Sequence, residues 1–215
     1  NKKPPQKKMP KFSIIVPHYQ GSISHEDFMR GIFSLAEQSY DDFEVLVYHD
    51  GPMLEPSQLK NFEVFESEER YNDFGHSLRD RGIREAEGEY IIHFNPDNVL
   101  FPEALETLAS FAEDTDPDVM VFPIKMMGLK EFQMDGERAV YYDKPRNLKE
   151  FIVFDGNPIK YGNIDCMQFV MKRDLWLKEG GWSDKREQSD AFMYTKFASK
   201  IPIHFIESDP LGEHY

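Results

Sequence analysis

The sequence predicts an α/β fold with a Rossmann-like, mainly parallel central sheet flanked by helices. Short apolar runs rich in β-branched residues alternate with segments of helical periodicity from residue 12 to about residue 122. Such alternation is typical of parallel strands joined by right-handed helical crossovers. The chain has 215 residues, 40% of them hydrophobic, which is enough for one sizeable core.

The first predicted unit is a strand, a loop and a helix. Phe12–Val16 is an apolar run with β-branched residues, and we expect Pro17 to end it. Ser24 stands three residues before Asp27, which forms a weak capping box at the start of a helix. The core-facing side of that helix is marked by Phe28, Ile32, Leu35 and Ala36.

The same order of elements then repeats. Phe43–Tyr48 predicts a strand that ends in the sequence HDGP, and Phe62–Phe65 predicts a shorter strand. Asp73–Glu87 predicts a helix that ends near Gly88. Tyr90–Phe94 predicts the next strand, so the pattern continues as expected for a parallel sheet.

The second half of the chain is less regular. Pro102 suits the first position of a further helix, and Asp118–Phe122 predicts a strand. Residues 124–165 mix aromatic residues, Gly, Pro and charges, which indicates irregular structure or a small antiparallel excursion. The other predicted elements are a helical stripe of Leu105, Leu108, Ala109 and Ala112, a strand at Phe169–Lys172, helices around Asp174–Glu179 and Ser189–Lys200, and a strand containing His204.

We expect one domain over residues 12–215. Residues 1–11 carry five Lys and no acidic residue, which predicts a flexible basic tail. The sequence begins without Met and ends at LGEHY with no obvious closing element, so we expect a domain taken from a longer chain. The formal charge of −14 argues against nucleic acid as a partner, because phosphate backbones bind to basic surfaces.

The cysteine content and hydropathy indicate a compartment. The single cysteine, Cys166, excludes an intramolecular disulfide and favours a reducing environment, where it would be a small buried hydrophobic residue. No run approaches the roughly 18–20 apolar residues that span a membrane. We therefore expect no transmembrane segment and a cytoplasmic location, either free or at the membrane face through a partner or a segment outside this sequence.

Three polar clusters follow predicted strands. They are His18-Tyr19, His49-Asp50-Gly51 and Asn95–Asn98. Each could be only a turn, because Asn, Asp, Gly and Pro favour turns. In a parallel sheet, however, these ends share one edge, where α/β proteins bind their ligands. The sequence has no Gly-rich phosphate loop, so a bound phosphate would need another neutralising group, such as a divalent metal on carboxylate oxygens.

Four segments together resemble a known family. They are SIIVPHYQG, SLAEQSYDDFEVLVYHDGP, SLRDRGIREAEGEYIIHFNPDN and GGWSD. In order and spacing they are similar to family 2 glycosyltransferases, which are inverting nucleotide-sugar enzymes of GT-A fold. The resemblance covers residues 12–112 well and 166–195 more loosely. It implies a nucleotide-sugar-binding half at 12–122, an acceptor-binding half at 123–215, and a role in polysaccharide biosynthesis.

The resemblance also implies roles for individual residues on the nucleotide side. Asp50 matches the second acid of the family's D-D-G-S and would bind the base, although alone it would be an Asp-Gly turn. Arg79 matches the Arg of A-R-N and would contact the phosphates, although alone it would be an ordinary helix charge. The implied nucleotide-binding set is Pro17, Tyr19, Asp50, Arg79 and Asn95.

The family's D-x-D motif becomes Asn95-Pro96-Asp97, which implies that Asp97 holds Mn²⁺ or Mg²⁺ against the diphosphate. Such an ion stabilises the charge that develops on the leaving group. His214 resembles the late His that completes this metal site in GT-A enzymes, and a structural or exposed histidine is the alternative. Asn95 and Asn98 replace family carboxylates, which implies weaker metal binding or an inactive enzyme.

The same resemblance implies a catalytic base. Inversion needs a group that takes a proton from the acceptor hydroxyl as it attacks. Ser189-Asp190 replaces the usual Glu-Asp pair, so Asp190 is the candidate base, and helix capping by either residue is the alternative. Trp182 would pack beneath the acceptor or form a wall of its site. Chain position places Tyr161, Asn163 and Asp165 near the acceptor as well.

Three functions follow from the sequence. The first is transfer from a nucleotide sugar, with UDP favoured over GDP and dTDP, to a hydroxyl on a glycan or similar acceptor. The second is a nucleotide- or sugar-binding module without turnover. The third is a nucleotidyltransferase, which ranks last because HYQGSIS lacks the basic, Gly-rich loop that follows the first strand of such enzymes.

Overall fold

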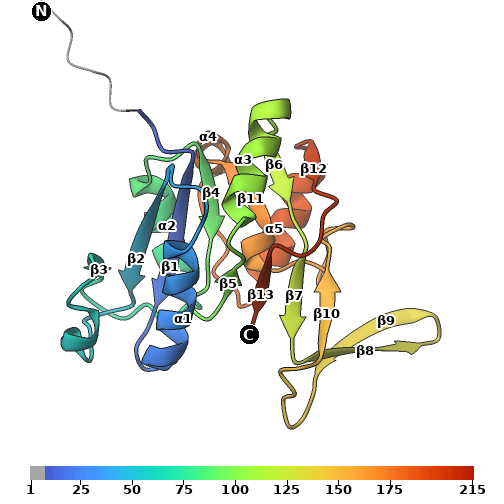
Figure 1. The fold of residues 1–215 in the computed structure, drawn as a ribbon, viewed down its shortest axis with the longest axis horizontal. Coiled ribbons are helices and arrows are strands. Elements are labelled where there is room, and N and C mark those ends of the chain that lie inside the picture. The colour runs from blue at the N-terminus through green and yellow to red at the C-terminus, as the bar shows by residue number, and fades with distance from the viewer. Residues whose placement is uncertain (1–7) are drawn as a thin grey trace, which may run out of the picture.

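A computed structural model describes residues 8–215 and shows a seven-stranded central sheet in the order β12-β6-β11-β4-β1-β2-β3 (Figure 1). All neighbouring strands run parallel except β11, which is antiparallel to both β4 and β6. The predicted mainly parallel sheet is thus confirmed, with one reversed strand. The strands are β1 Phe12–His18, β2 Phe43–His49, β3 Val64–Glu66, β4 Tyr90–His93, β6 Val119–Val121, β11 Phe169–Lys172 and β12 Ile203–Phe205.

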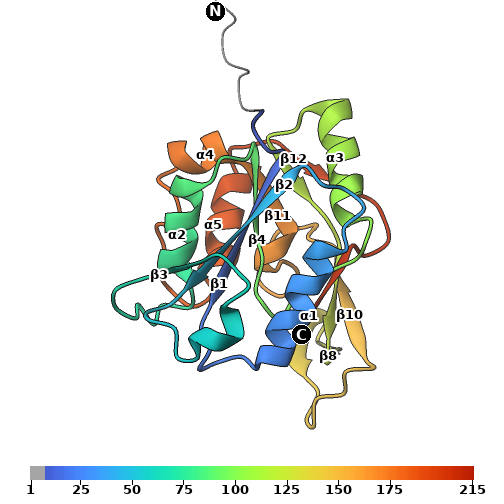
Figure 2. The same ribbon diagram turned by 60° about the vertical axis from the view of Figure 1, so that its left-hand side comes forward.

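Helices cover both faces of this sheet (Figure 2). Alternate residues of β1 point to opposite faces, so Ile14 packs in the core under α1 and α3, and Ile15 packs in the core under α2, α4 and α5. The helices are α1 His25–Ala36, α2 His76–Glu85, α3 Ala104–Thr115, α4 Arg173–Lys178 and α5 Ser189–Ala198, with 3₁₀ turns at η1 Pro56–Leu59 and η2 Cys166–Gln168.

Residues 124–165 form the antiparallel excursion that was one of the two predictions for this segment. β7 pairs antiparallel with β10, and the hairpin β8–β9 projects from the body (Figure 1). The prediction that LGEHY provides no closing element is wrong, because β13 lies between β7 and β5 in a second sheet. These strands are β5 Val99–Leu100, β7 Ile124–Met127, β8 Leu129–Met134, β9 Glu137–Tyr142, β10 Phe151–Phe154 and β13 Gly212–His214.

Several predicted boundaries need correction. Pro17 does not end β1, which continues to His18 in parallel register with β2. The neighbouring strand β4 pairs only with Phe12–Ile15, so the missing N–H of Pro17 falls where that side of β1 has no partner. β3 begins at Val64 and not at Phe62. Pro102 precedes α3 by two residues, because the helix begins at Ala104.

The start of α2 also differs from the prediction. The helix begins at His76, and Asp73 lies in the preceding loop, where its carboxylate accepts a hydrogen bond from the N–H of Ser77. Residues 1–7 of the predicted tail lie outside the described residues. Lys11 is attached to the body, since its Nζ lies 3.0 Å from a carboxylate oxygen of Glu89.

Two further observations concern composition. Cys166 is a free, buried cysteine, and burial raises the pKa of its thiol to about 12. It is therefore the inert hydrophobic residue that the sequence predicts. Within residues 8–215, we find no helix whose length and apolar character would let it cross a membrane.

Candidate active site

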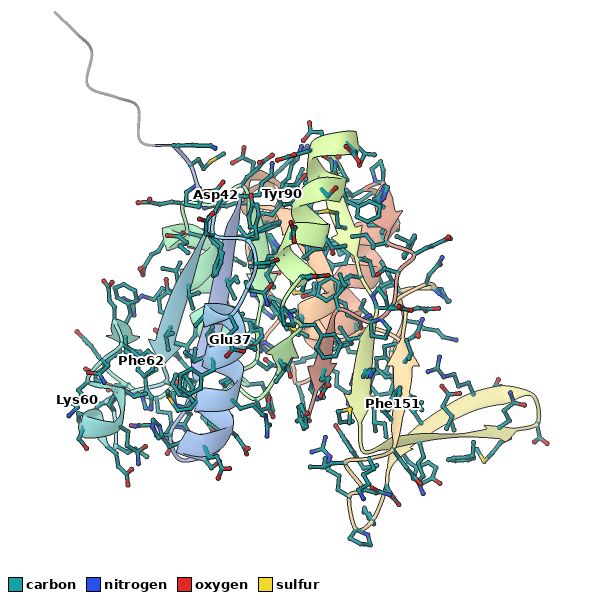
Figure 3. All side chains as sticks on the ribbon, in the orientation of Figure 1. Glu37, Asp42, Lys60, Phe62, Tyr90 and Phe151 are labelled. Carbon is teal, nitrogen blue, oxygen red and sulfur yellow. The ribbon has the colours of Figure 1, made fainter. Side chains whose placement is uncertain are left out.

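A cavity of about 410 Å³ lies where β1, β2 and β4 end. Figure 3 labels Asp42 and Tyr90 at the opposite edge of the sheet, where β2 and β4 begin. All three polar clusters expected at the carboxyl edge contribute to the cavity, so their predicted convergence is confirmed. Its lining includes Pro17, Tyr19, Asp50, Gly75, Arg79, Asn95 and Asp97.

Asp50 is buried and fixes the loop that covers this end of the cavity. Its Oδ1 accepts a 2.7 Å hydrogen bond from the N–H of Tyr71, and its Oδ2 accepts one of 3.1 Å from the N–H of Asn72. Nε of Arg70 lies 3.6 Å from the same Oδ2. The carboxylate therefore positions the 70–72 loop, whatever further bond it makes to a ligand.

Tyr19 presents one ring face to Arg70, whose guanidinium carbon lies 3.7 Å from the ring centroid. Arginine stacks readily on aromatic faces and on nucleobases. The pair forms a flat, polarisable wall at the end of the cavity that Pro17 also lines. Sequence reasoning missed Arg70, because only the fold brings this loop over β1.

Arg79 is 4% exposed and lies on α2 at the far end of the cavity. Its guanidinium donates to the carbonyl of Phe74 at 2.7 Å, to Nδ1 of His76 at 2.9 Å and to Oδ1 of Asn95 at 2.6 Å. Among residues 8–215 it forms no ion pair with a carboxylate, and its Nε has no partner. A buried cation without a counter-ion, facing a cavity, fits an anionic ligand.

The 95–98 loop is held against α1 at Gly31. A Cβ at this position would lie 2.2 Å from the carbonyl oxygen of Pro96 and 2.8 Å from that of Asn98. Asn98 is fully buried, and its Nδ2 lies 3.8 Å from Sδ of Met167. The loop is therefore a structured platform that aims Asn95 and Asp97 into the cavity.

A smaller cavity of about 190 Å³ adjoins the first, and the two share Phe74, Arg79 and Asn95. Asp165, Glu187 and Asp190 contribute carboxylates to its lining. Sequence reasoning missed Phe74, His76 and Glu187. The structure thus brings Arg79, Asn95, Asp165 and Asp190 of the predicted set to one continuous site.

Asp190 is the second residue of α5, whose N-cap is Gln188. Neither Ser189 nor Asp190 caps the helix, so the capping alternative is wrong. The pKa of Asp190 is raised to about 6, mainly by burial and then by the negative charge of Asp165, while the N–H of Ala191 and the charge of Arg79 oppose the rise. A carboxylate in this range suits proton abstraction near neutral pH.

Asp165, Asp97 and His214 form an electrostatic group beside the two cavities. Nδ1 of His214 lies 3.2 Å from Oδ1 of Asp165, which is the distance of an ion pair when the imidazole is protonated. Burial would lower the pKa of His214, but the carboxylates of Asp165 and Asp97 outweigh burial and raise it. Burial alone would raise the pKa of Asp165, yet His214 and two backbone N–H groups hold it below its usual value.

A divalent metal fits this group only with help from a ligand. Among residues 8–215, no three His, Cys, Asp or Glu side chains are placed to hold an ion by themselves. Mg²⁺ beside phosphates typically takes one or two carboxylates from the protein and completes its shell with phosphate oxygens and water. The carboxylate of Asp97 and the imidazole of His214, once it has lost its proton, are donors of the type that Mn²⁺ accepts.

Trp182 is fully buried and lines neither cavity. Its ring stacks on His76 at 5.1 Å, and its Nε1 donates a 3.1 Å hydrogen bond to Oγ of Ser189. Burial, followed by the charge of Arg79, lowers the pKa of His76 to about 4, so this ring is neutral. Trp182 therefore forms no wall of either cavity and packs behind His76, and its relation to an acceptor stays a prediction.

The other residues predicted near the acceptor differ from one another. Tyr161 is 66% exposed, and its hydroxyl accepts a hydrogen bond from Gln188. Asn163 is buried, and its side chain bonds to Asp155 and to the carbonyl of Pro158. Asn163 therefore has a structural role in the 155–163 loop.

These features together define a class of protein: an α/β protein with a cavity lined by a buried arginine at the carboxyl edge of its sheet and a carboxylate-rich cavity beside it. The family model for glycosyl transferase family 2 matches residues 13–176. The chain belongs to glycosyl transferase family 2, and the resemblance seen in the sequence is confirmed.

Curated relatives match about half of the chain. Uncharacterized glycosyltransferase YibD of Escherichia coli K12 is 27% identical over 114 residues, which are 51% of this chain and 32% of YibD. Poly(ribitol-phosphate) beta-N-acetylglucosaminyltransferase TarS of Staphylococcus aureus strain Mu50 is 30% identical over 130 residues, which are 56% of this chain and 22% of TarS. The chain therefore spans a third or less of these relatives.

Solved structures show the same GT-A fold. TarS 1–349 of S. aureus in complex with UDP-GlcNAc has a TM-score of 0.69 at 17% identity, over 95% of this chain and 58% of that chain. The mannosyltransferase PcManGT of Pyrobaculum calidifontis in complex with GDP-Man and Mn²⁺ has a TM-score of 0.64 at 16% identity, over 99% of this chain and 60% of that chain.

Proposed function

We propose that this chain is an inverting, metal-assisted glycosyltransferase that moves a sugar from a UDP-sugar to a hydroxyl group of a glycan or similar acceptor. One observation carries the proposal. Arg79, a buried cation without a carboxylate partner among the described residues, and Asp190, whose pKa is about 6, line the same small cavity. An anion-binding group beside a base is the arrangement that displacement of a diphosphate needs.

On the donor side, Pro17, Tyr19 and Asp50 surround the base, while Arg79 and Asn95 contact the phosphates and ribose. UDP is favoured because TarS, a relative at 30% identity, has also been solved with UDP and with UDP-GlcNAc. In this proposal, residues 12–122 bind the nucleotide sugar and residues 123–215 bind the acceptor.

The reaction is a single displacement. Asp190 takes the proton of the acceptor hydroxyl as its oxygen bonds to the anomeric carbon of the donor sugar. The bond from that carbon to the diphosphate oxygen breaks, and its electron pair leaves on the diphosphate, beside Arg79. Attack from the side opposite to the leaving group inverts the anomeric centre. Asp165 accepts a hydrogen bond from the acceptor, and Trp182 packs beneath the residues that bind the acceptor.

Asp97 and His214 would hold Mn²⁺ or Mg²⁺ against the diphosphate. When bound, the ion supplies positive charge that stabilises the leaving nucleoside diphosphate. Asn95 adds no charge, because its side chain is a neutral amide, and its Oδ1 already accepts a hydrogen bond from Arg79. The protein therefore contributes two ligands, and we expect the metal to bind much more tightly with UDP than without it.

A thermal-shift experiment tests the donor and the metal together. We expect UDP with Mn²⁺ to raise the melting temperature more than GDP or dTDP with Mn²⁺, because ligands that bind the native state stabilise it by mass action. Asp97→Ala should remove the Mn²⁺ dependence. Arg79→Met should weaken UDP binding and leave uridine binding unchanged, because uridine has no phosphate.

The matched control is Arg84→Met, which removes an exposed arginine from the same helix outside both cavities. Equal binding of UDP by wild type and Arg79→Met would contradict the proposed donor site. Binding without transfer to any sugar acceptor would favour the second candidate, a binding module. That candidate is motivated by the lack of a three-residue metal site among residues 8–215.

A further inference from the structure

Phe74 is an exposed aromatic residue at the junction of the two cavities. It is 57% exposed, and it lines both cavities, together with Arg79 and Asn95. Phenylalanine is normally buried. An aromatic side chain left open to solvent inside a ligand site is a feature that binding sites use for orientation.

The backbone at Phe74 adopts an unfavourable conformation. Phe74 has a φ of +61°, which is a true outlier for a bulky residue, and it is followed by Gly75 at +81°. A Cβ on Gly75 would lie 2.9 Å from Cβ of Pro17, so this segment is pressed against β1. Strained residues of this kind persist where surrounding bonds over-determine them, and they cluster at functional sites.

Those surrounding bonds come from the donor site itself. Arg79 donates to the carbonyl of Phe74 at 2.7 Å, and the Asp50 carboxylate holds the N–H groups of Tyr71 and Asn72 just before it. The N–H of His76 bonds to the carbonyl of Asp73 at 3.1 Å. The backbone on either side of Phe74 is therefore fixed, in part by Arg79 and Asp50, which are placed around the nucleotide in the proposed function.

We propose that Phe74 is a specificity-determining residue whose ring packs against the transferred sugar of the donor. This inference rests on the proposed function. The base end of the larger cavity is formed by Pro17 and Tyr19, whereas the residues that Phe74 shares between the two cavities are Arg79 and Asn95, at the phosphates. The next group along a nucleotide sugar is the sugar, which must lie between Arg79 and Asp190 for transfer to occur. A sugar ring presents a face of C–H groups, which packs favourably on an aromatic face.

Calorimetric titration with UDP, UDP-glucose and UDP-GlcNAc in the presence of Mn²⁺ tests this inference. We expect Phe74→Ala to lower the affinity for the UDP-sugar that the wild type binds more tightly by about three- to tenfold, which is the range for loss of one aromatic contact. UDP affinity should stay within twofold of wild type, and Phe74→Tyr should retain sugar affinity. In steady-state transfer, KM for the donor should rise more than kcat falls.

Two controls separate the ring from the backbone. Phe74→Gly removes the ring, so it should lower the affinity for the UDP-sugar as much as Phe74→Ala does. Because glycine adopts a positive φ without strain, Phe74→Gly should also have a higher melting temperature than Phe74→Ala. Phe33→Ala removes a phenylalanine of similar exposure, 56%, from α1 outside both cavities, and it should change no affinity.

Three results would overturn the inference. Equal losses for UDP and the UDP-sugars in Phe74→Ala would show that the ring contacts the nucleotide. Unchanged affinities would show that it contacts no part of the donor, and the proposed function would stand. A wild-type protein that binds neither UDP nor any UDP-sugar would overturn the proposed function, and this inference with it.

Discussion

The two adjoining cavities differ in how far their polar groups are already satisfied. In the larger cavity, the Asp50 carboxylate accepts two backbone hydrogen bonds and Arg79 donates to three acceptors. In the smaller cavity, the Asp190 carboxylate receives no side-chain donor from the described residues, and burial raises its pKa to about 6. The side chains of the larger cavity are thus held in place without a ligand, whereas the smaller cavity contains a carboxylate, Asp190, that no described side chain binds.

In the proposed function, this difference separates donor binding from proton transfer along one continuous site. Groups fixed by several bonds give a ligand a defined orientation at low reorganisation cost. A buried carboxylate that receives hydrogen bonds only from backbone N–H groups is unfavourable for the folded state but is well suited to accept a proton. The following variants test whether the two regions are as independent as their contacts suggest.

The largest effect is expected from Asp190→Asn. Removal of a general base typically lowers the rate about 10²- to 10⁴-fold, while the donor site stays intact. We therefore expect a loss of kcat of this order, with UDP-sugar affinity near wild type by calorimetry. In the wild type, kcat should fall as the pH drops below about 6, because Asp190 is then protonated.

The control for this variant is Asp174→Asn, which changes an exposed aspartate in the first turn of α4. It should leave the rate unchanged. If Asp190→Asn retained wild-type kcat, the smaller cavity would not contain the base. If it lost donor affinity as well, the two regions would be coupled.

The next effect concerns stability of the same variant. The folded-state pKa of Asp190, about 6, lies above its unfolded value of 3.8. The wild type is therefore most stabilised by this group below pH 3.8, and that contribution is lost as the pH rises through 6. The negative charge of Asp165 raises the pKa of Asp190, and the positive charge of Arg79 lowers it.

Asp190→Asn should thus gain stability relative to wild type between pH 4 and pH 7, by at most about 3 kcal/mol. Urea unfolding at both pH values measures the difference. If the stability of the two proteins changed with pH in parallel, Asp190 would have an ordinary pKa. The proposed difference between the two cavities would then be wrong.

A smaller effect is expected at the platform beneath the larger cavity. Gly31→Ala would force its Cβ against the carbonyls of Pro96 and Asn98. We expect a loss of about 1–3 kcal/mol in the free energy of unfolding. Because the 95–98 loop must shift, Mn²⁺-dependent UDP binding should weaken in a thermal-shift titration.

Gly88→Ala is the matched control, since its Cβ would lie 2.4 Å from Oγ of Ser13 at the opposite edge of the sheet. It should cost comparable stability but leave UDP binding intact. Equal weakening of UDP binding by both variants would indicate a general loss of stability and not a shift of the platform.

The smallest effect on stability is expected from the buried hydrogen bond between Trp182 and Ser189. Ser189→Ala removes the acceptor of the buried Trp182 N–H, which should cost about 1 kcal/mol in stability. Ser199→Ala, at an exposed serine just after the same helix, should change stability by less than about 0.5 kcal/mol. A Ser189 variant as stable as the Ser199 variant would show that this hydrogen bond contributes nothing.

The strands of the first half and the polar edge of the sheet could be predicted because they follow from local patterns, whereas the order of the strands and the reversal of β11 could not. Short, continuous apolar runs indicated β1, β2 and β4, and parallel topology brings their ends to one edge. Asp190 was identified through resemblance to the family, and its position on α5 at the smaller cavity is a structural finding. The helix cap was the alternative that the structure removed.

The features that could not be predicted depend on contacts between distant segments. Phe74 adopts its positive φ because Asp50 and Arg79 hold the surrounding loop, and no local sequence signal encodes that combination. His214 meets Asp165 only because β13 pairs with β5 and β7. Trp182 is an apolar residue in a Gly-rich turn, and its burial depends on Ser189 and His76.

The position of β13 has a consequence for biosynthesis. β5 follows the 95–98 loop directly, and its hydrogen-bonded partner, Gly212–His214, is made more than a hundred residues later. Chains emerge from the ribosome amino end first, so the parallel core of β1, β2 and β4 can form while this partner is still missing. Under the proposed function, the nascent protein would then hold its donor-binding residues before β13 supplies His214, and transfer would require β13 to be in place.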